Sequence, residues 1–170
     1  MAKQTRDAEF TEYVASRSGW LRKVAYLLCG DWHRADDLVQ ETITKLYVHW
    51  AKASRAKNVD GYARRTLVNT FLAEQRTSWW RRTVRAGAEP DIAAESIDLD
   101  VSLDLRQALA ALPPRQRATV VLRYYCDLSI DQAAEALNCS SGNVKSQSAR
   151  ALDTLRRSLV LVPDVAERTS

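Results

Sequence analysis

Cysteine and histidine are scarce in this 170-residue chain, and their placement excludes several kinds of site. The three cysteines, Cys29, Cys126 and Cys139, are odd in number, widely spaced and without a CxxC pair. A disulfide scaffold or a zinc site needs paired or closely spaced ligands. The two histidines, His33 and His49, lie far from two of the three cysteines. We therefore expect free thiols in a cytosolic protein, with no metal and no cofactor.

Glycine and proline are also rare, with five and four residues, and long apolar runs are missing. Strand-like alternation with paired turn signals does not occur, so the chain is predicted to be helical throughout. No stretch approaches the roughly 18 uninterrupted apolar residues that a membrane span needs. The first residues form no apolar segment of the kind that a signal peptide needs. These absences predict a cytoplasmic, all-α protein.

Charge is present in blocks, although the formal net charge is only +4. Hydrophobic residues make up 46% of the chain, which is enough for a core and argues against disorder. One block is basic and contains Lys52, Arg55, Lys57, Arg64, Arg65, Arg76, Arg81, Arg82 and Arg85, against Asp60 and Glu74. The next is acidic and contains Glu89, Asp91, Glu95, Asp98, Asp100 and Asp104, with no basic residue. The basic block predicts a polyanionic partner.

Helical periodicity divides the first half of the chain into three helices, which predict one small bundle. The first helix is expected from about Ala8 to Leu28, and Gly30 ends it. The second is expected over 32–50, with Asp31 as its cap, and a loop over 51–61 follows. The third is expected over 61–75, with Asp60 as its cap. Expected core residues are Phe10, Tyr13, Val14, Leu21, Val24, Leu28, Ala35, Leu38, Val39, Thr42, Ile43, Leu46, Trp50, Tyr62, Leu67, Val68, Phe71 and Leu72.

The composition changes near residue 85 and again near residue 102. The segment between is rich in Ala, Asp and Glu, contains Gly87 and Pro90, and has no aromatic residue, which is typical of a linker. Two helices broken at Pro113-Pro114 are expected next, because proline fits the first turn of a helix. Expected core residues there are Val120, Val121, Leu122 and Tyr125.

The end of the chain has the pattern of a helix-turn-helix. The stripe Ile130, Ala133, Ala134 and Leu137 predicts one helix face, and "NCS" makes a short turn. Ser140 is the expected N-cap of the next helix, whose buried face would contain Val144, Ala151, Leu152 and Leu155. In such a motif the second helix enters the major groove of DNA.

The outward positions of that second helix are Asn143, Lys145, Ser146, Gln147 and Arg150. Their chemistry suits base and phosphate contacts, since Arg and Lys pair with guanine, and Asn and Gln with adenine. The alternative is a solvated polar face on an ordinary helical hairpin. Periodicity alone leaves both interpretations open.

Three stretches together resemble the extracytoplasmic-function (ECF) bacterial sigma factors, the promoter-recognition subunits of RNA polymerase. "DDLVQETITKLY" resembles the polymerase-binding helix of that group, and "DGYARRTLVNTFLAEQR" its −10 promoter helix. "ALAALPPRQRATVVLRYYCDLSIDQAAEALNCSSGNVKSQSARALDTLRR" resembles its −35 domain. The form "VKSQSARAL" is similar to the SigE-like actinobacterial branch. The resemblance implies sigma domain 2 over 1–85, a flexible acidic linker over 86–102 and sigma domain 4 over 103–162.

The resemblance implies core RNA polymerase, through its β′ clamp helices and β flap, and promoter DNA as partners. The acidic set Asp36, Asp37, Gln40 and Glu41 would dock on the clamp helices; the alternative is a solvated acidic face. The loop residues Arg55, Lys57 and Asn58 would build a pocket for an unpaired −10 base. Arg64, Arg65 and Asn69 would follow phosphates or base edges, or merely make the helix soluble. Trp79 and Trp80 could stack on bases or close the core.

Other expectations depend on the same resemblance. The linker would thread through the RNA exit channel of polymerase, with a plain solvated tether as the alternative. An anti-sigma partner, if one exists, should cover the polymerase or DNA surfaces. The sequence departs from the family pattern at Ser148, where many members have a larger aliphatic residue, and at Gln147, where arginine is frequent.

Two other classes of protein are alternatives to a sigma factor without catalytic residues. A stand-alone helix-turn-helix repressor or activator would use only residues 103–160 and would leave the docking helix unexplained. It would normally dimerise on a palindrome. An enzyme would need a clustered nucleophile, base or metal set, which the sequence does not offer.

Overall fold

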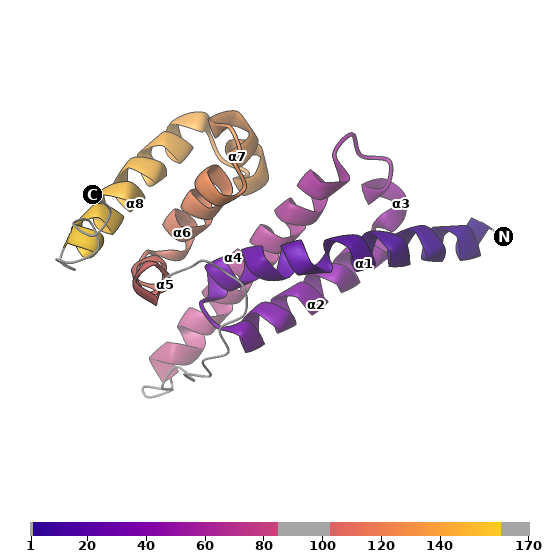
Figure 1. Ribbon diagram of the computed structural model, residues 1–170, viewed down its shortest axis with the longest axis horizontal. Coiled ribbons are helices and arrows are strands. Elements are labelled where there is room, and N and C mark those ends of the chain that lie inside the picture. Colours follow the sequence, from indigo (N-terminus) through magenta and orange to yellow (C-terminus); the bar gives the residue numbers. More distant parts are fainter. Residues whose placement is uncertain (1, 85–102, 161–170) are drawn as a thin grey trace, which may run out of the picture. The chain divides into compact units, whose positions relative to one another are not determined.

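The computed structural model describes residues 2–84 and 103–160, and within them every regular element is a helix (Figure 1). The side chains of residues 78–84 and 160 fall outside the described set, as does the proposed linker over 86–102. The chain divides into two compact units, Met1–Ile97 and Asp98–Ser170. Each unit has its own buried core, so each is described by itself.

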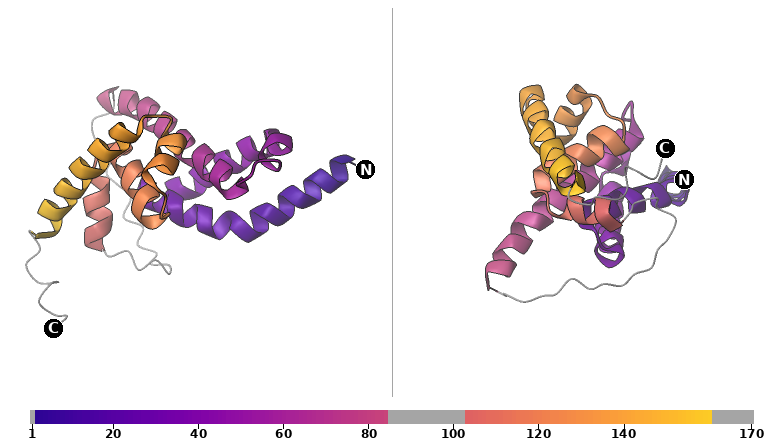
Figure 2. Two further views of the ribbon diagram at one scale, coloured as in Figure 1. Left: turned by 90° about the horizontal axis from the view of Figure 1, so that it is seen from above. Right: turned by 60° about the vertical axis from the view of Figure 1, so that its left-hand side comes forward.

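The first unit is built on the long helix α1 (Ala2–Cys29), which lies along α2 (Trp32–Val48) in every view (Figures 1 and 2). The predicted stop at Gly30 is confirmed, because this glycine has φ of 73° and its N–H bonds the carbonyl of Tyr26 at 2.7 Å. The predicted start near Ala8 is wrong by about two turns. Tertiary contacts to this early segment, such as the Tyr47 hydroxyl donating to Asp7 at 3.1 Å, do not appear in its sequence pattern.

Helix α2 begins as predicted, since the Asp31 carboxylate accepts a hydrogen bond from the backbone N–H of His33 at 2.9 Å. It ends at Val48 and not at Trp50, and a separate short helix α3 (Trp50–Ala53) follows. The expected loop over 51–61 is therefore partly helical. The break allows Trp50 to turn inward, where it is 4% exposed and packs against the rings of Phe10 and Tyr13.

Helix α4 (Val59–Val84) is longer at both ends than the predicted 61–75. The expected cap, Asp60, is wrong. Asn58 precedes the helix, and its side-chain oxygen accepts from the backbone N–H of Gly61 at 2.9 Å, while Asp60 lies in the first turn. The inner face of α4 contains the expected Leu67, Val68, Phe71 and Leu72, all buried.

The second unit contains α5 (Leu103–Ala110), α6 (Pro114–Val120), the π-helical turn η1 (Val121–Tyr125), α7 (Ile130–Leu137) and α8 (Ser141–Val160). Pro114 occupies the first turn of α6, as predicted. Val120, Val121 and Leu122 are buried, but Tyr125 is 43% exposed, so its assignment to the core is wrong. The wider turn of η1, in which the Cys126 N–H bonds the carbonyl of Val121, changes the helical register there and turns Tyr125 outward.

Candidate nucleic-acid interface and docking surface

Helices α7 and α8 form the predicted helix-turn-helix, and its geometry is set by local caps. Ser129 and Gln132 form a reciprocal capping box at the start of α7, with hydrogen bonds of 3.1 and 2.9 Å. Asn138 ends α7 in the left-handed conformation, with φ of 53°. The Ser140 hydroxyl then accepts from the backbone N–H of Asn143 at 3.1 Å, which confirms Ser140 as the cap of α8.

A hydrogen bond between the two helices adds to these caps. The hydroxyl of Ser141, at the start of α8, donates to the carboxylate of Asp131 in the first turn of α7 at 2.7 Å. Sequence reasoning missed this bond, which joins residues ten positions apart. Together with the buried Ala133 and Ala134 of α7, it fixes the position of the first turn of α8.

The outer face of α8 has the expected polar side chains. Asn143, Lys145, Ser146 and Arg150 are exposed, and Gln147 is half-buried. Among the described residues, the side chains of Lys145, Ser146 and Arg150 have no hydrogen bond or ion pair. The opposite face is closed by Val144, Ala151 and Leu155. Gln147 is therefore less open to a ligand than the other four.

Ser148 lies on the inner face of α8, as the periodicity predicts, and is 9% exposed. Its hydroxyl is buried and has no hydrogen-bond partner among the described residues. A buried hydroxyl without a partner loses its hydration and receives nothing in exchange. This residue is therefore a weak point in the core that supports α8.

The basic surface of the first unit is formed by the turn over 54–58 and the outer face of α4. Arg55, Lys57, Asn58, Arg65 and Asn69 are exposed. Arg64 differs, because it is half-buried and its guanidinium carbon lies 5.4 Å from the centroid of the Trp20 ring. Its Nε atom is buried and has no hydrogen-bond partner in the part of the chain that the structure describes. Arg64 therefore packs against Trp20 and is less accessible to a ligand than the exposed residues of this surface. The side chains of Trp79 and Trp80 lie outside the described residues.

Asp60 interrupts this basic surface, and its carboxylate is tied to α1. The hydroxyl of Tyr13 donates to Asp60 Oδ1 at 2.8 Å, and Arg17 forms an ion pair with Asp60 Oδ2 at 3.0 Å. Burial and this hydrogen bond raise the pKa of Tyr13, so that the hydroxyl keeps its proton. Sequence analysis missed this contact, since the partners lie 47 residues apart.

The acidic set on α2 is exposed at all four positions, Asp36, Asp37, Gln40 and Glu41. Two of the four have partners. The Arg22 guanidinium donates hydrogen bonds to the two carboxylate oxygens of Asp36, at 2.6 Å and 3.4 Å. The same guanidinium lies 4.3 Å from the centroid of the Trp32 ring. Glu41 pairs with Lys45 at 3.5 Å. Among the described residues, the side chains of Asp37 and Gln40 have no hydrogen bond or ion pair.

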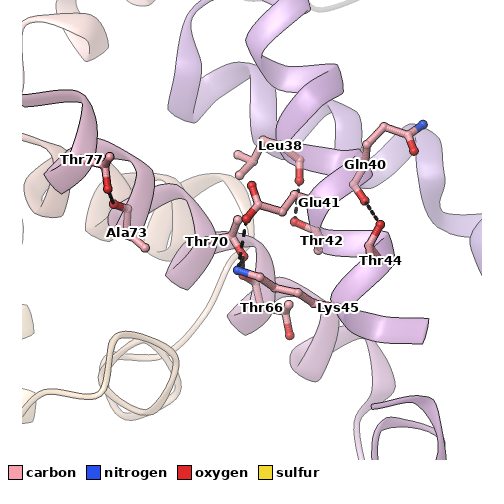
Figure 3. A network of polar contacts seen from close by, with 10 residues as sticks. All are labelled: Leu38, Gln40, Glu41, Thr42, Thr44, Lys45, Thr66, Thr70, Ala73 and Thr77. Atoms are coloured by element: carbon pink, nitrogen blue, oxygen red, sulfur yellow. Dashed lines mark hydrogen bonds and ion pairs between the residues drawn. The ribbon is translucent and has the colours of Figure 1, made fainter. Parts of the chain in front are cut away.

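Lys45 connects this face to α4 (Figure 3). Its ammonium group lies between Glu41 and the hydroxyl of Thr70, to which it donates at 3.1 Å, and Thr70 in turn donates to the carbonyl of Thr66 at 2.7 Å. Glu74 lies one turn further along α4. Burial and the neighbouring Glu41 carboxylate raise the pKa of Glu74 to about 7, and hydrogen bonding to Glu74 lowers the pKa of Glu41.

No group of histidine, cysteine or acidic side chains within residues 2–84 and 103–160 is arranged to hold a metal ion. In the same residues, no helix has the length and apolar character to cross a membrane.

Comparisons with known proteins match both units. The family model described as Sigma-70 region 2 matches residues 13–81, and that described as Sigma-70 region 4 matches residues 102–155. The chain is 36% identical to the RNA polymerase sigma-E factor of Streptomyces coelicolor, a match that covers 89% of this chain and 86% of the relative. It is 30% identical to the ECF RNA polymerase sigma factor EcfG of Rhodopseudomonas palustris, over 86% and 82% of the two chains.

Solved structures confirm the all-α fold. The sigma factor RpoE in its complex with the anti-sigma factor NepR from Bartonella quintana matches with a TM-score of 0.70 at 24% identity, over 91% of this chain and 98% of that one. CnrH in its complex with the cytosolic domain of CnrY matches with a TM-score of 0.64 at 18% identity, over 92% and 90%. At such identities the likeness concerns the fold alone.

Proposed function

The chain belongs to the ECF RNA polymerase sigma factors, and from this premise we propose a role for each of its surfaces. It is an alternative sigma factor that directs RNA polymerase to promoters. The observation that carries this function is the presence of a region 2 unit and a region 4 unit in one chain, in that order. Its relatives are initiation factors, and we propose that this chain likewise has no catalytic residue, works in the cytoplasm and leaves the chemistry to polymerase.

The acidic face of α2 is proposed as the surface that docks on the β′ clamp helices. Asp37 and Gln40 form its centre, because their side chains are exposed and have no hydrogen bond or ion pair within residues 2–84 and 103–160. Asp36 and Glu41 lie beside this centre, and they form ion pairs with Arg22 and Lys45, respectively. Complementary charge across such a surface increases the rate of association and fixes the register of the partners.

The basic surface of the first unit is proposed as the −10 interface. Arg55, Lys57 and Asn58 come from one exposed turn, so they can surround a base that has left the duplex. Arg65 and Asn69 are exposed at i and i+4 on α4, and can follow the adjoining strand. Arg64 contributes charge from a position partly covered by Trp20.

The outer face of α8 is proposed as the −35 reader, with Lys145, Ser146 and Arg150 at its centre, and Asn143 and Gln147 beside them. The caps of α8 leave its first turns facing outward, which is the end of a recognition helix that meets base edges. The domain boundaries at 1–85, 86–102 and 103–162 remain part of this proposal, together with the β flap as the partner of the second unit.

An anti-sigma partner is proposed as well. The two similar solved structures each contain a second protein: the sigma factor RpoE is in complex with the anti-sigma factor NepR, and CnrH with the cytosolic domain of CnrY. We propose that a protein of this kind covers the docking face of α2 or the DNA face of α8. A partner on the docking face should compete with core polymerase, and the Asp37→Lys variant should then be impaired in binding both.

The experiment that tests the function is reconstitution with core RNA polymerase. We expect the chain to co-purify with core, and the complex to bind and open promoter DNA, whereas the isolated chain binds the same duplex weakly. Each unit offers only a small DNA surface, and two weak contacts become strong when a scaffold fixes their spacing. Tight, sequence-specific binding by the isolated chain at physiological salt, unaffected by core, would favour a stand-alone repressor or activator.

A further inference from the structure

We propose that Tyr13 and Arg17 of α1, through Asp60, are positioning residues for recognition of the −10 element, although neither need touch DNA. This inference depends on the proposed −10 surface and adds to it a set of contacts behind the DNA-facing side chains. Asp60 is an acidic residue within this basic surface.

A carboxylate in the first turn of α4 is a liability for a surface that binds phosphate. Asp60 follows the exposed Arg55, Lys57 and Asn58 and precedes Arg64 and Arg65. A free negative charge here would repel the DNA backbone. The side chain is only 32% exposed, however, and both of its oxygens are occupied, one by the Tyr13 hydroxyl and one by Arg17. The carboxylate of Asp60 is thus bound by two residues of α1, and its negative charge is partly neutralised by Arg17.

The same contacts fix the beginning of α4 in space. Tyr13 is anchored by its ring, which lies 5.4 Å from the ring of Trp50, a residue that is 4% exposed. Its hydroxyl therefore approaches Asp60 from a side chain that has little freedom to move. Arg17 lies one helical turn further along α1 and binds the second oxygen. Two bonds from a rigid helix determine both the position and the rotation of the first turn of α4.

The turn over 54–58 lies directly before this first turn of α4 in the chain. Asn58 caps α4 by accepting from the N–H of Gly61, the residue directly after Asp60. A Cβ atom at Gly61 would lie 2.9 Å from Nδ2 of Asn58, so the cap is packed tightly against this glycine. A shift of Asp60 would therefore be transmitted to Asn58 and to the basic residues before it. The contact between α1 and α4 thus sets where the proposed base pocket lies.

The test is promoter opening by reconstituted holoenzyme with Tyr13→Phe, which removes only the hydroxyl and keeps the ring against Trp50. We expect core binding and −35 preference to stay as in the wild type. Promoter opening should fall roughly fivefold, the size of effect expected for the net loss of one intramolecular hydrogen bond. A library of −10 sequences should show a relaxed base preference, which a loss of stability alone would not produce.

Tyr47→Phe is the matched control, because it also removes a tyrosine hydroxyl that donates to an aspartate, but it joins α2 to Asp7 of α1 and does not involve Asp60. It should leave the −10 preference unchanged. Asp60→Asn keeps an acceptor for Tyr13 and loses the charge that Arg17 binds, so it should give an intermediate relaxation. If Asp60→Asn is combined with Tyr13→Phe, the effects should be less than additive, since both act through one contact.

The outcomes separate this inference from the proposed function. Wild-type protein that does not bind core or open promoters would remove the proposed function itself. Wild-type protein that opens promoters, together with a Tyr13→Phe variant of unchanged −10 preference, would overturn the inference alone. A uniform loss of opening on all −10 sequences would likewise overturn it, because it would assign Tyr13 to stability and not to positioning.

Discussion

In the first unit, three acidic side chains of the charged surface are held by ion pairs, whereas in the second unit the exposed side chains of α8 are directed by the helix that carries them. In the first unit, Asp36, Glu41 and Asp60 each pair with a basic residue. In the second unit, Lys145, Ser146 and Arg150 have no such partner among the described residues, and the caps of α8 set their direction. A substitution in the first unit should therefore disturb its neighbours, while one on the outer face of α8 should act locally.

The largest expected effect is loss of polymerase binding in the double variant Asp37→Lys, Glu41→Lys. Reversing two charges at the proposed docking face places like charges against the basic partner, and we expect affinity for core polymerase to fall roughly 100-fold. The measurement is a quantitative pull-down or a competition assay with wild-type protein. Both residues are exposed, so the helical content should not change.

The matched control for docking is Glu9→Lys, Glu12→Lys, which makes the same change in net charge at two exposed positions of α1. It should bind core like the wild type. If the docking variant binds core polymerase as tightly as the wild type does, the acidic face of α2 is an ordinary solvated surface and not a docking surface.

The next effect concerns the recognition helix. Arg150→Ala should reduce −35-dependent transcription roughly tenfold if the guanidinium contacts a guanine, since such a contact contributes about 1–3 kcal/mol and its loss relaxes base choice. Lys145→Ala should instead weaken binding to all sequences and lower the salt dependence if it contacts a phosphate. A −35 library and a salt titration with holoenzyme distinguish the two roles.

Arg156→Ala is the control for this helix, because Arg156 is also an exposed arginine of α8 but lies further from its N-terminus. It should leave the −35 preference intact. If Arg150→Ala and Lys145→Ala are equally silent, the outer face of α8 is a solvated surface and the DNA contacts lie elsewhere.

A smaller effect is expected in the pH dependence of the first unit. The pKa of Glu74 is raised to about 7 from its ordinary value of 4.5, so the folded state holds this proton more tightly than the unfolded state. Stability from this group is fully present below pH 4.5 and is lost as pH rises through about 7. Glu74→Gln should remove that loss and stabilise the unit near pH 8 by roughly 1 kcal/mol, after discounting for solvent screening.

Tryptophan fluorescence is a suitable probe for this prediction, because all five tryptophans (Trp20, Trp32, Trp50, Trp79 and Trp80) belong to the first unit. Denaturant melts at several pH values would give the slope for each variant. Glu135→Gln, at an exposed position of the second unit, is the control. An unchanged slope in Glu74→Gln would show that the Glu41–Glu74 contact does not retain a proton.

The smallest expected effect is a gain in stability from Ser148→Ala in the second unit. The serine hydroxyl is buried and has no partner among the residues that the structure describes, and alanine is the better helix former, so we expect a gain of roughly 1 kcal/mol. Calorimetry of the full chain should show the transition of the second unit move upward while that of the first stays in place. A lower transition would mean that the hydroxyl has a partner, such as a buried water.

Local features of the sequence predicted much of the fold. The caps Asp31 and Ser140, the stop at Gly30 and the placement of Pro114 depend on backbone groups within a few residues, so their signals are present in the sequence. The periodic apolar stripes similarly identified most of the buried residues. The errors occurred where a local signal had a competitor. Asp60 was the expected cap of α4, but its carboxylate binds Tyr13 and Arg17, and Asn58 accepts from the N–H of Gly61 instead.

The sequence by itself determined the helices, the helix-turn-helix and the family, because helical periodicity, capping and motif order are all written along the chain. The tertiary structure decided which exposed residues are free and which are engaged. Arg22 and Asp36 lie 14 residues apart, Lys45 and Thr70 lie 25 apart, and Tyr13 and Asp60 lie 47 apart. Such pairs form only when packed helices bring their side chains within hydrogen-bonding distance. The periodicity of one helix shows which of its own residues are buried, but it does not show which side chains of another helix lie opposite them.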